Sequence, residues 1–98
     1  MPTYEIPERV LREFRKLSLE DQRRFLRALR EFVAALREDP PAFAPRLRVK
    51  RVQGHVGVWE LSFAPDGRAT FCYGEERERG EAHVIWRRIG DHSIFADP

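Results

Sequence analysis

A hairpin signal near the middle of the chain constrains the fold more than any other feature. The segment Val56–Ala64 alternates in polarity, and its apolar face is formed by Trp59, Leu61 and Phe63. Positions 65–68 read Pro-Asp-Gly-Arg, which is typical of a tight turn because proline presets the backbone, aspartate bonds back to it and glycine accepts a positive φ. The segment Ala69–Tyr73 is therefore predicted to return as the partner strand.

Three other segments have strand character. Arg46–Val52 alternates apolar with basic residues, and His83–Ile89 follows a charged loop as the last strand. Thr3–Ile6 is either an edge strand or a lead into a helix. Because Glu60 and Ser62 make the second face of the hairpin polar, we expect the sheet to have one covered face and one open face.

The amino-terminal half shows the period of two amphipathic helices. The first begins at Pro7, which suits a first helical position, and Ser18 then caps a second helix over about Leu19–Glu38. The apolar stripe of the second helix must be buried, and we expect it to pack on the apolar face of the hairpin. The stripe consists of Phe25, Leu26, Leu29, Phe32, Val33 and Leu36. The opposite face carries Arg23, Arg24, Arg27, Arg30 and Arg37.

These elements predict a single α+β domain over residues 1–98, with an amino-terminal helix hairpin packed on a mostly antiparallel sheet of about four strands. No apolar run approaches the roughly 18 residues of a membrane span, and no secretory signal is visible, so we expect a cytoplasmic protein without membrane contact. The one cysteine, Cys72, fits that compartment. The histidines lack metal-binding spacing and no phosphate-binding glycine loop is present, so neither a metal nor a nucleotide cofactor is expected.

Basic residues concentrate on the predicted sheet. The whole chain has a net charge of +2, whereas positions 46–73 carry five basic residues against Glu60 and Asp66, a net charge of +3. This distribution favours contact with nucleic acid. The five basic residues are Arg46, Arg48, Lys50, Arg51 and Arg68. A solvated strand face is the alternative explanation for Arg48 and Lys50.

The three histidines differ in their sequence context. His55 lies in a loop between strands and His83 opens a strand, and we expect both to be ordinary surface side chains. His92 follows Gly-Asp at the end of the last strand, and Arg87 and Arg88 come just before it. A group that titrates near neutral pH beside fixed positive charge suits phosphodiester chemistry.

The order of these segments resembles the RelE/ParE toxins of bacterial toxin–antitoxin pairs. The similarity covers Val10–Phe95, and its most specific parts are Trp59-Glu60-Leu61 and the ending Gly90-Asp91-His92. That ending is similar to the YafQ-like branch, whose members are ribosome-dependent mRNA endonucleases. The resemblance implies metal-free cleavage of mRNA on the ribosome, in which the 2′-hydroxyl attacks the adjacent phosphate, and it implies neutralisation by a cognate antitoxin.

The resemblance also implies roles for individual residues. His92 is expected to be the general acid or base, Asp66 to belong to the catalytic set, and Lys50 to hold a phosphate or donate a proton. Phe95 matches the aromatic residue that follows the family histidine and is expected to stack on a base. The expected RNA-binding arginines are Arg46, Arg48, Arg51, Arg68 and Arg87. Turn chemistry alone is the alternative for Asp66, and packing of the tail is the alternative for Phe95.

Two positions depart from the YafQ-like pattern, which tends to place histidines where this chain has Lys50 and Ser62. Because serine does not easily replace a general acid, two other functions stay open. The first is a ParE-like inhibitor of DNA gyrase, which would need neither His92 nor the basic sheet. The second is a degenerate protein that keeps the fold and its antitoxin but has lost the chemistry.

Overall fold

The computed structural model describes residues 1–98, and its first half is the expected pair of helices. Helix α1 spans Glu8–Lys16 and helix α2 spans Leu19–Leu36. Pro7 is the capping residue before α1 rather than its first helical residue, whereas Ser18 caps α2 as predicted by accepting a hydrogen bond from the Asp21 amide at 3.1 Å. Neither helix combines the length and the apolar character needed to cross a membrane.

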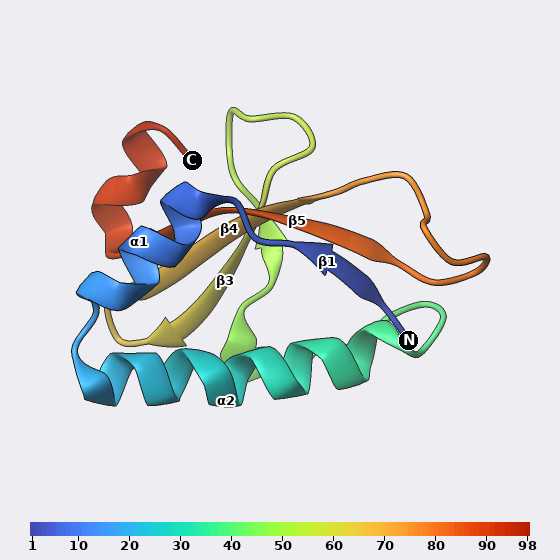
Figure 1. The fold of residues 1–98 in the computed structure, drawn as a ribbon, viewed down its shortest axis with the longest axis horizontal. Coiled ribbons are helices and arrows are strands. Elements are labelled where there is room, and N and C mark those ends of the chain that lie inside the picture. Colours follow the sequence, from blue (N-terminus) through green and yellow to red (C-terminus); the bar gives the residue numbers. More distant parts are fainter.

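The sheet has five strands, one more than predicted. They are β1 (Thr3–Glu5), β2 (Lys50–Arg51), β3 (Trp59–Ala64), β4 (Gly67–Tyr73) and β5 (His83–Gly90). Their order is β1-β5-β4-β3-β2, and only β1 and β5 run parallel, so the sheet is mostly antiparallel as expected (Figure 1). The additional strand is β1, whose residues 3–5 pair with residues 83–85 at the sheet edge.

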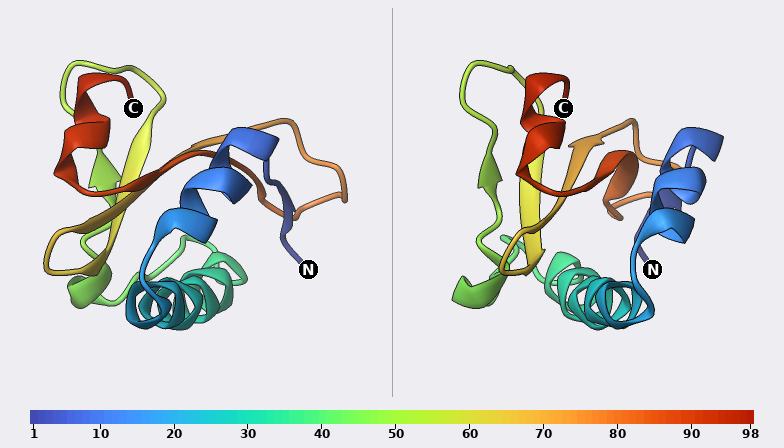
Figure 2. Two further views of the ribbon diagram at one scale, coloured as in Figure 1. Left: turned by 60° about the vertical axis from the view of Figure 1, so that its left-hand side comes forward. Right: turned by 90° about the vertical axis from the view of Figure 1, so that its left-hand side faces the viewer.

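The core lies between α2 and one face of the sheet, as the apolar stripe and the hairpin predicted. The ring of Phe32 on α2 lies 4.9 Å from the ring of Phe71 and 5.5 Å from that of Trp86, measured between centroids. Leu26 departs from the predicted stripe, because it lines an apolar groove between the two helices and remains 45% exposed. Figure 2 shows α2 on one side of the sheet and a carboxy-terminal 3₁₀ helix, η2 (His92–Ala96), on the other.

The prediction of a strand over Arg46–Val52 is wrong for most of these residues. Pro45 starts a short 3₁₀ helix, η1 (Pro45–Leu47), and Arg48 ends it with φ 49° and ψ 44°. Only Lys50–Arg51 pairs with β3, so β2 is two residues long. The alternation that suggested a strand has another cause. The 3₁₀ turn points Leu47 into the core, where it is 3% exposed, while the residues on either side of it are exposed to solvent.

The polar side chains on the second face of β3 are buried, although we expected that face to be open. Glu60 and Ser62 are each only 9% exposed. Glu60 has paired neighbours on both sides, Lys50 on β2 and Thr70 on β4, so the side chains of adjacent strands enclose it. The residues expected to be a short tail form η2, which packs against β4 and β5 on this side.

Two smaller expectations are also corrected by the packing. Strand β3 begins at Trp59 rather than Val56, because Gly57, two residues before it, has a φ of 78° that takes the chain out of the extended conformation. His83 is buried rather than on the surface, because β1 covers it. Its Nδ1 atom lies 2.6 Å from the hydroxyl oxygen of Thr3, which is its paired residue on β1.

Candidate active site

Asp66 and His92 meet at one end of the sheet. Asp66 lies in the two-residue turn between β3 and β4, and His92 is the first residue of η2, directly after β5 and Asp91. The Nδ1 atom of His92 is 2.8 Å from Oδ1 of Asp66, and the His92 backbone N–H donates to the same oxygen at 3.3 Å. The sheet register causes this meeting, because Arg68 beside the turn pairs with Gly90 at the end of β5.

The contact changes the acid–base properties of both side chains. The hydrogen bond, followed by the charge of Asp66, raises the pKa of His92 above its ordinary 6.5. The same hydrogen bond lowers the pKa of Asp66 below its ordinary 3.8. With Nδ1 directed at the carboxylate, Nε2 is left to act on a substrate. It accepts a proton in the neutral ring and donates one in the protonated ring. Both side chains are largely exposed, so a substrate can reach them.

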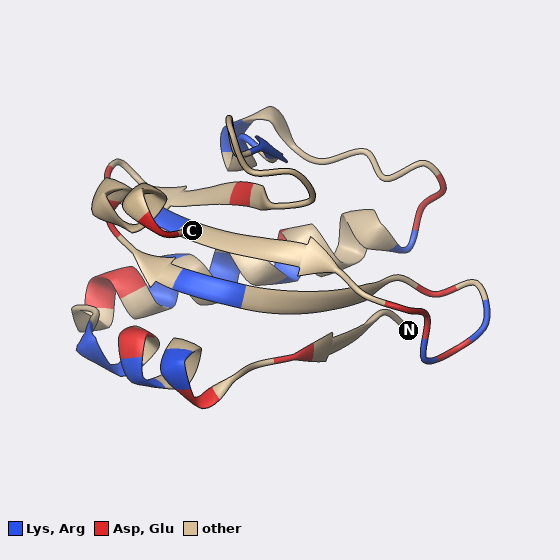
Figure 3. Ribbon diagram, turned by 90° about the horizontal axis from the view of Figure 1, so that it is seen from above, with Lys and Arg blue, Asp and Glu red and all other residues tan.

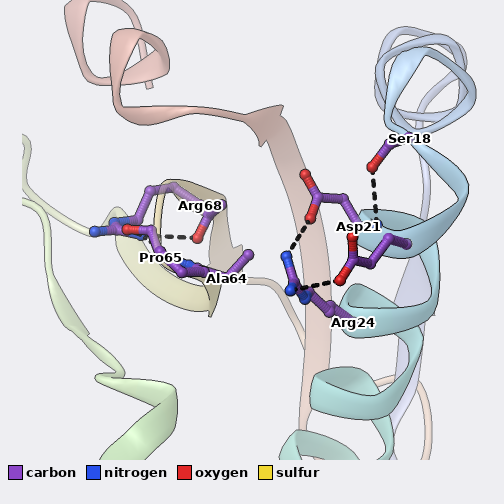
Figure 4. A network of polar contacts seen from close by, with 8 residues as sticks. Ser18, Asp21, Arg24, Ala64, Pro65 and Arg68 are labelled. Atoms are coloured by element: carbon purple, nitrogen blue, oxygen red, sulfur yellow. Dashed lines mark hydrogen bonds and ion pairs between the residues drawn. The ribbon is translucent and has the colours of Figure 1, made fainter.

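The turn that carries Asp66 is held in a defined shape. Nη1 of Arg68 donates to the backbone carbonyls of Gly67 at 2.9 Å and Ala64 at 3.2 Å (Figure 4). A Cβ atom on Gly67 would lie 2.5 Å from the ring of Phe63, so only glycine fits there without a shift of the core. The backbone of the turn from which Asp66 projects is therefore fixed by the Arg68 side chain and by the packing of Phe63 against Gly67.

Helix α1 fixes the end of β5, from which His92 follows. Glu13 accepts one hydrogen bond from Nε of Arg88 at 2.8 Å and another from the Ile89 amide at 3.1 Å. The side chains of Glu13 and Arg88 are each 17% exposed, so water competes little for this contact. Nη1 of Arg88 also donates to the Asp97 carbonyl at 2.8 Å, which joins β5 to the segment after η2.

Lys50 does not join the His92–Asp66 pair. It is paired with Glu60, and its ammonium nitrogen lies 4.0 Å from the Glu60 carboxylate. Glu60 comes four residues before the end of β3 at Ala64. A strand rises about 3.3 Å per residue, so Lys50 lies roughly 13 Å along the sheet from the turn.

The other predicted RNA contacts are dispersed over the molecule. Arg51 lies over the ring of Trp59, 5.3 Å from its centroid, on the far edge of the sheet. Nε of Arg87 donates to the Pro98 carbonyl at 3.0 Å. Phe95 is half-buried within η2. Arg46 is on η1 rather than on a strand, and it forms an ion pair with Glu31 of α2.

Sequence reasoning missed two groups of residues near this end of the sheet. Glu13 was not singled out, although it fixes the end of β5. Arg24 and Arg27 were assigned only to the solvated face of α2, yet they line a cleft of about 410 Å³ beside the turn. A spacing of three residues between two arginines on one helix face is the only sequence signal for such a cleft, and it is a weak one. No group of three or more His, Cys, Asp or Glu side chains lies together as a metal site would require.

No protein-family model and no curated protein sequence matches this chain. Solved structures do match it over nearly its full length. The E. coli DinJ–YafQ toxin–antitoxin complex matches with 14% identity and a TM-score of 0.63, over 95% of this chain and 94% of the other. The YoeB/ParE toxin from Agrobacterium tumefaciens matches with 12% identity and a TM-score of 0.65, over 92% and 98%.

A copper-bound mutant toxin from Helicobacter pylori is similar to this chain at the same level, with 14% identity and a TM-score of 0.62 over 95% of this chain and 97% of that one. At such low identity the likeness concerns the fold. It confirms the RelE-like α+β architecture that the sequence led us to expect, with a fifth strand added.

Proposed function

We propose that this protein, which has the fold of the RelE/ParE toxins, is the toxin of a type II toxin–antitoxin pair and cleaves mRNA on the ribosome. The observation that carries the proposal is the contact between His92 and Asp66. It gives an exposed histidine a fixed orientation and a raised pKa at the end of the chain where the resemblance to YafQ-like endonucleases is most specific. A gyrase inhibitor would have no use for such a pair.

The reaction needs two proton transfers. The 2′-oxygen attacks the adjacent phosphorus as a base removes its proton, and the bond from phosphorus to the 5′-oxygen breaks as an acid protonates that oxygen. The products are a 2′,3′-cyclic phosphate and a 5′-hydroxyl. His92 performs one of the two transfers through Nε2, since Nδ1 is held by Asp66. Asp66 is the positioning residue that keeps the ring in this orientation and stabilises its protonated form.

The surrounding basic residues supply positive charge for the phosphates. Arg68 keeps one side of its guanidinium on the turn carbonyls, and its remaining N–H groups are available to a phosphate. Lys50, which is too far along the sheet to touch His92, is proposed to hold a phosphate of a neighbouring nucleotide. Arg51, Arg87 and Phe95 remain predicted RNA contacts.

The proposed partner is a cognate antitoxin protein. One of the similar structures is the complex of YafQ with DinJ, and that pairing motivates the proposal for this chain. We expect an antitoxin to bind this protein and to stop its action, which co-expression of the two proteins from one operon would measure as recovery of growth.

An in vitro translation reaction tests the cleavage activity. Purified protein is added to ribosomes translating a defined mRNA, and primer extension maps the new 5′ ends. Wild type is expected to cut only translated mRNA, and His92→Ala is expected to remove the cuts. His55→Ala is the matched control, because His55 is an exposed loop histidine that does not belong to the His92–Asp66 pair.

The outcomes separate the proposal from its alternatives. Intact mRNA with wild-type protein contradicts the endonuclease, and a supercoiling assay with DNA gyrase then tests the ParE-like function. Equal cutting by wild type and His92→Ala contradicts the role of His92 while leaving the nuclease in place. Growth arrest that persists in His92→Ala without cut mRNA also rejects the proposed reaction.

A further inference from the structure

The cleft beside the Asp66 turn is strongly basic. It lies between α2, η1 and the outer edge of β3, and Ala64 and Pro65, which lead into the turn, form part of its wall. Its charged residues are five arginines and one glutamate, a net charge of +4. We call it the arginine cleft, and its charged residues are Arg24, Arg27, Arg46, Arg48, Arg68 and Glu31. Figure 3 shows basic segments on both α2 and the η1–β2 stretch.

Three of the five arginines already have partners within the protein. Arg24 forms ion pairs with Glu20 at 2.7 Å and with Asp21 at 3.1 Å (Figure 4). Arg46 is paired with Glu31, and Arg68 donates to the carbonyls of the turn. Internal partners of this kind hold these three side chains in place and reduce their capacity to bind a ligand.

Arg27 and Arg48 differ from the other three. Neither guanidinium forms an ion pair or a hydrogen bond within the protein, and the two come from different walls of the cleft, α2 and η1. An arginine presents a planar set of donors that matches the oxygens of a phosphate. The arginine cleft therefore offers two free guanidinium groups, beside three that are held, to an anionic ligand that enters it.

The backbone of Arg48 provides an independent indication. Arg48 is the single residue other than glycine that has a positive φ, at 49°. Such a conformation is unfavourable for a residue with a Cβ atom, and it persists where the surrounding structure imposes it, often at binding sites. Here the preceding residue, Leu47, is buried in the core, and the amide of Arg48 donates to the Pro45 carbonyl. The strained backbone places the arginine in the wall of the cleft.

We propose that the arginine cleft binds the phosphate backbone of a single-stranded RNA next to the cleavage site, through Arg27 and Arg48. The proposal rests on the proposed function for the identity of the strand as RNA. The cleft has no exposed aromatic side chain for base stacking, since its one aromatic residue, Phe63, is 8% exposed, so it recognises phosphates without reading bases. Its shared wall with the Asp66 turn lets a strand held at His92 continue into it.

Binding of an RNA that cannot be cut tests the cleft without requiring catalysis. The probe is a fluorescent 12-nucleotide 2′-O-methyl RNA, whose blocked 2′-oxygen prevents attack, and anisotropy is measured over a salt series. The test variant is Arg27→Gln with Arg48→Asn, because asparagine tolerates a positive φ. The matched control is Arg23→Gln with Arg30→Gln, which removes the same charge from α2 outside the cleft. Thermal melts verify that all variants fold.

The expected result is quantitative. Each phosphate contact to a single strand contributes a slope of about 0.7 to the dependence of log K on log salt, so the cleft variant should lose about 1.4 from the slope. Over the decade from 1 M to 0.1 M salt, this slope corresponds to a gain in the association constant of about five-fold per contact. Loss of both contacts should therefore weaken binding at 0.1 M salt about 25-fold. The control variant should lose less than about three-fold in affinity, because its two arginines act on the RNA only through the weaker long-range electrostatic field. Changing the base sequence of the probe should leave the affinity unchanged.

Three outcomes overturn the inference. Equal losses in the cleft and control variants show that only bulk charge matters. A strong dependence on base sequence shows a different binding mode. An oligoglutamate peptide that displaces the RNA more readily than unlabelled RNA of the same length shows that the cleft is a peptide site. Wild-type protein that binds the probe through the cleft but leaves translated mRNA intact rejects the proposed function alone. Wild-type protein that cuts mRNA, with a cleft variant that binds the probe no more weakly than the control variant, rejects the cleft alone.

Discussion

Replacing Glu13 with alanine is expected to destabilise the protein by about 2–5 kcal/mol, because Glu13 connects α1 to the end of β5. The substitution leaves the buried Ile89 amide without its partner, which costs about 1–3 kcal/mol. It also removes a charge-assisted hydrogen bond from Arg88, which is worth about 1–2 kcal/mol after a discount for the 17% exposure of both side chains. Arg88 keeps its bond to the Asp97 carbonyl, so it is not left entirely unpaired.

Urea unfolding and thermal melts measure this loss. In a domain of this size about 1 kcal/mol corresponds to roughly 4–8 °C in Tm, so Glu13→Ala should melt about 10–40 °C below wild type. Glu13→Gln is the matched control, since its remaining oxygen still accepts from the Ile89 amide while the charge is lost, and it should cost about 1–2 kcal/mol. Hydrogen exchange at the Ile89 amide should accelerate more in Glu13→Ala than the global change in stability explains.

The reasoning is refuted if Glu13→Ala costs less than about 0.5 kcal/mol, the range of an ordinary surface substitution. It is also refuted if Glu13→Gln is as damaging as Glu13→Ala, because the backbone hydrogen bond would then contribute nothing. Faster hydrogen exchange at the Ile89 amide with unchanged overall stability would show that the contact has only a local effect and that α1 does not stabilise β5 through it.

Three further predictions concern the turn and the helix cap. Asp66→Asn should lower the pKa of His92 toward 6.5 in an NMR titration. In wild type, the stabilisation that His92 gains from the pair is fully present below the pKa of histidine in the unfolded chain, and it is lost as the pH rises through the raised pKa of His92. At the acid end, the stabilisation is lost as the pH falls through the lowered pKa of Asp66. A titration unchanged by the substitution contradicts the contact. Gly67→Ala should destabilise by about 1–3 kcal/mol, because the new methyl group meets the Phe63 ring, and unchanged urea unfolding would show that the ring moves freely. Ser18→Ala should cost about 1 kcal/mol in the same assay, whereas Ser18→Gly should cost only a few tenths.

The elements that sequence predicted well are those whose causes are local. The hairpin follows from alternation and from turn residues at positions 65–68, and the start of α2 follows from the hydroxyl of Ser18. The segment Arg46–Val52 failed because a buried Leu47 next to exposed arginines has the same pattern in a 3₁₀ turn as in a strand. The burial of His83 could not be predicted from its local sequence, because the strand that covers it lies 80 residues away in the chain.

The candidate site shows the same division. Asp66 and His92 were both selected from sequence, but their contact depends on the pairing of Arg68 with Gly90, which no local pattern encodes. Glu13 and Arg27 were missed, because one charged residue on an amphipathic helix looks like any other solvated position until the tertiary structure places something against it.

The pairing of β1 with β5 determines the order in which this chain can assemble. During synthesis the first strand leaves the ribosome early and has no partner until the last strand, residues 83–90, has followed it. Closing so long a loop adds little to the equilibrium cost, since each doubling of length costs only about 0.6 kcal/mol, but long-range pairing slows folding. Because the same strand also leads to His92, the edge of the sheet and the His92–Asp66 pair are completed together only after residues 83–92 have been synthesised, so a shorter nascent chain has neither.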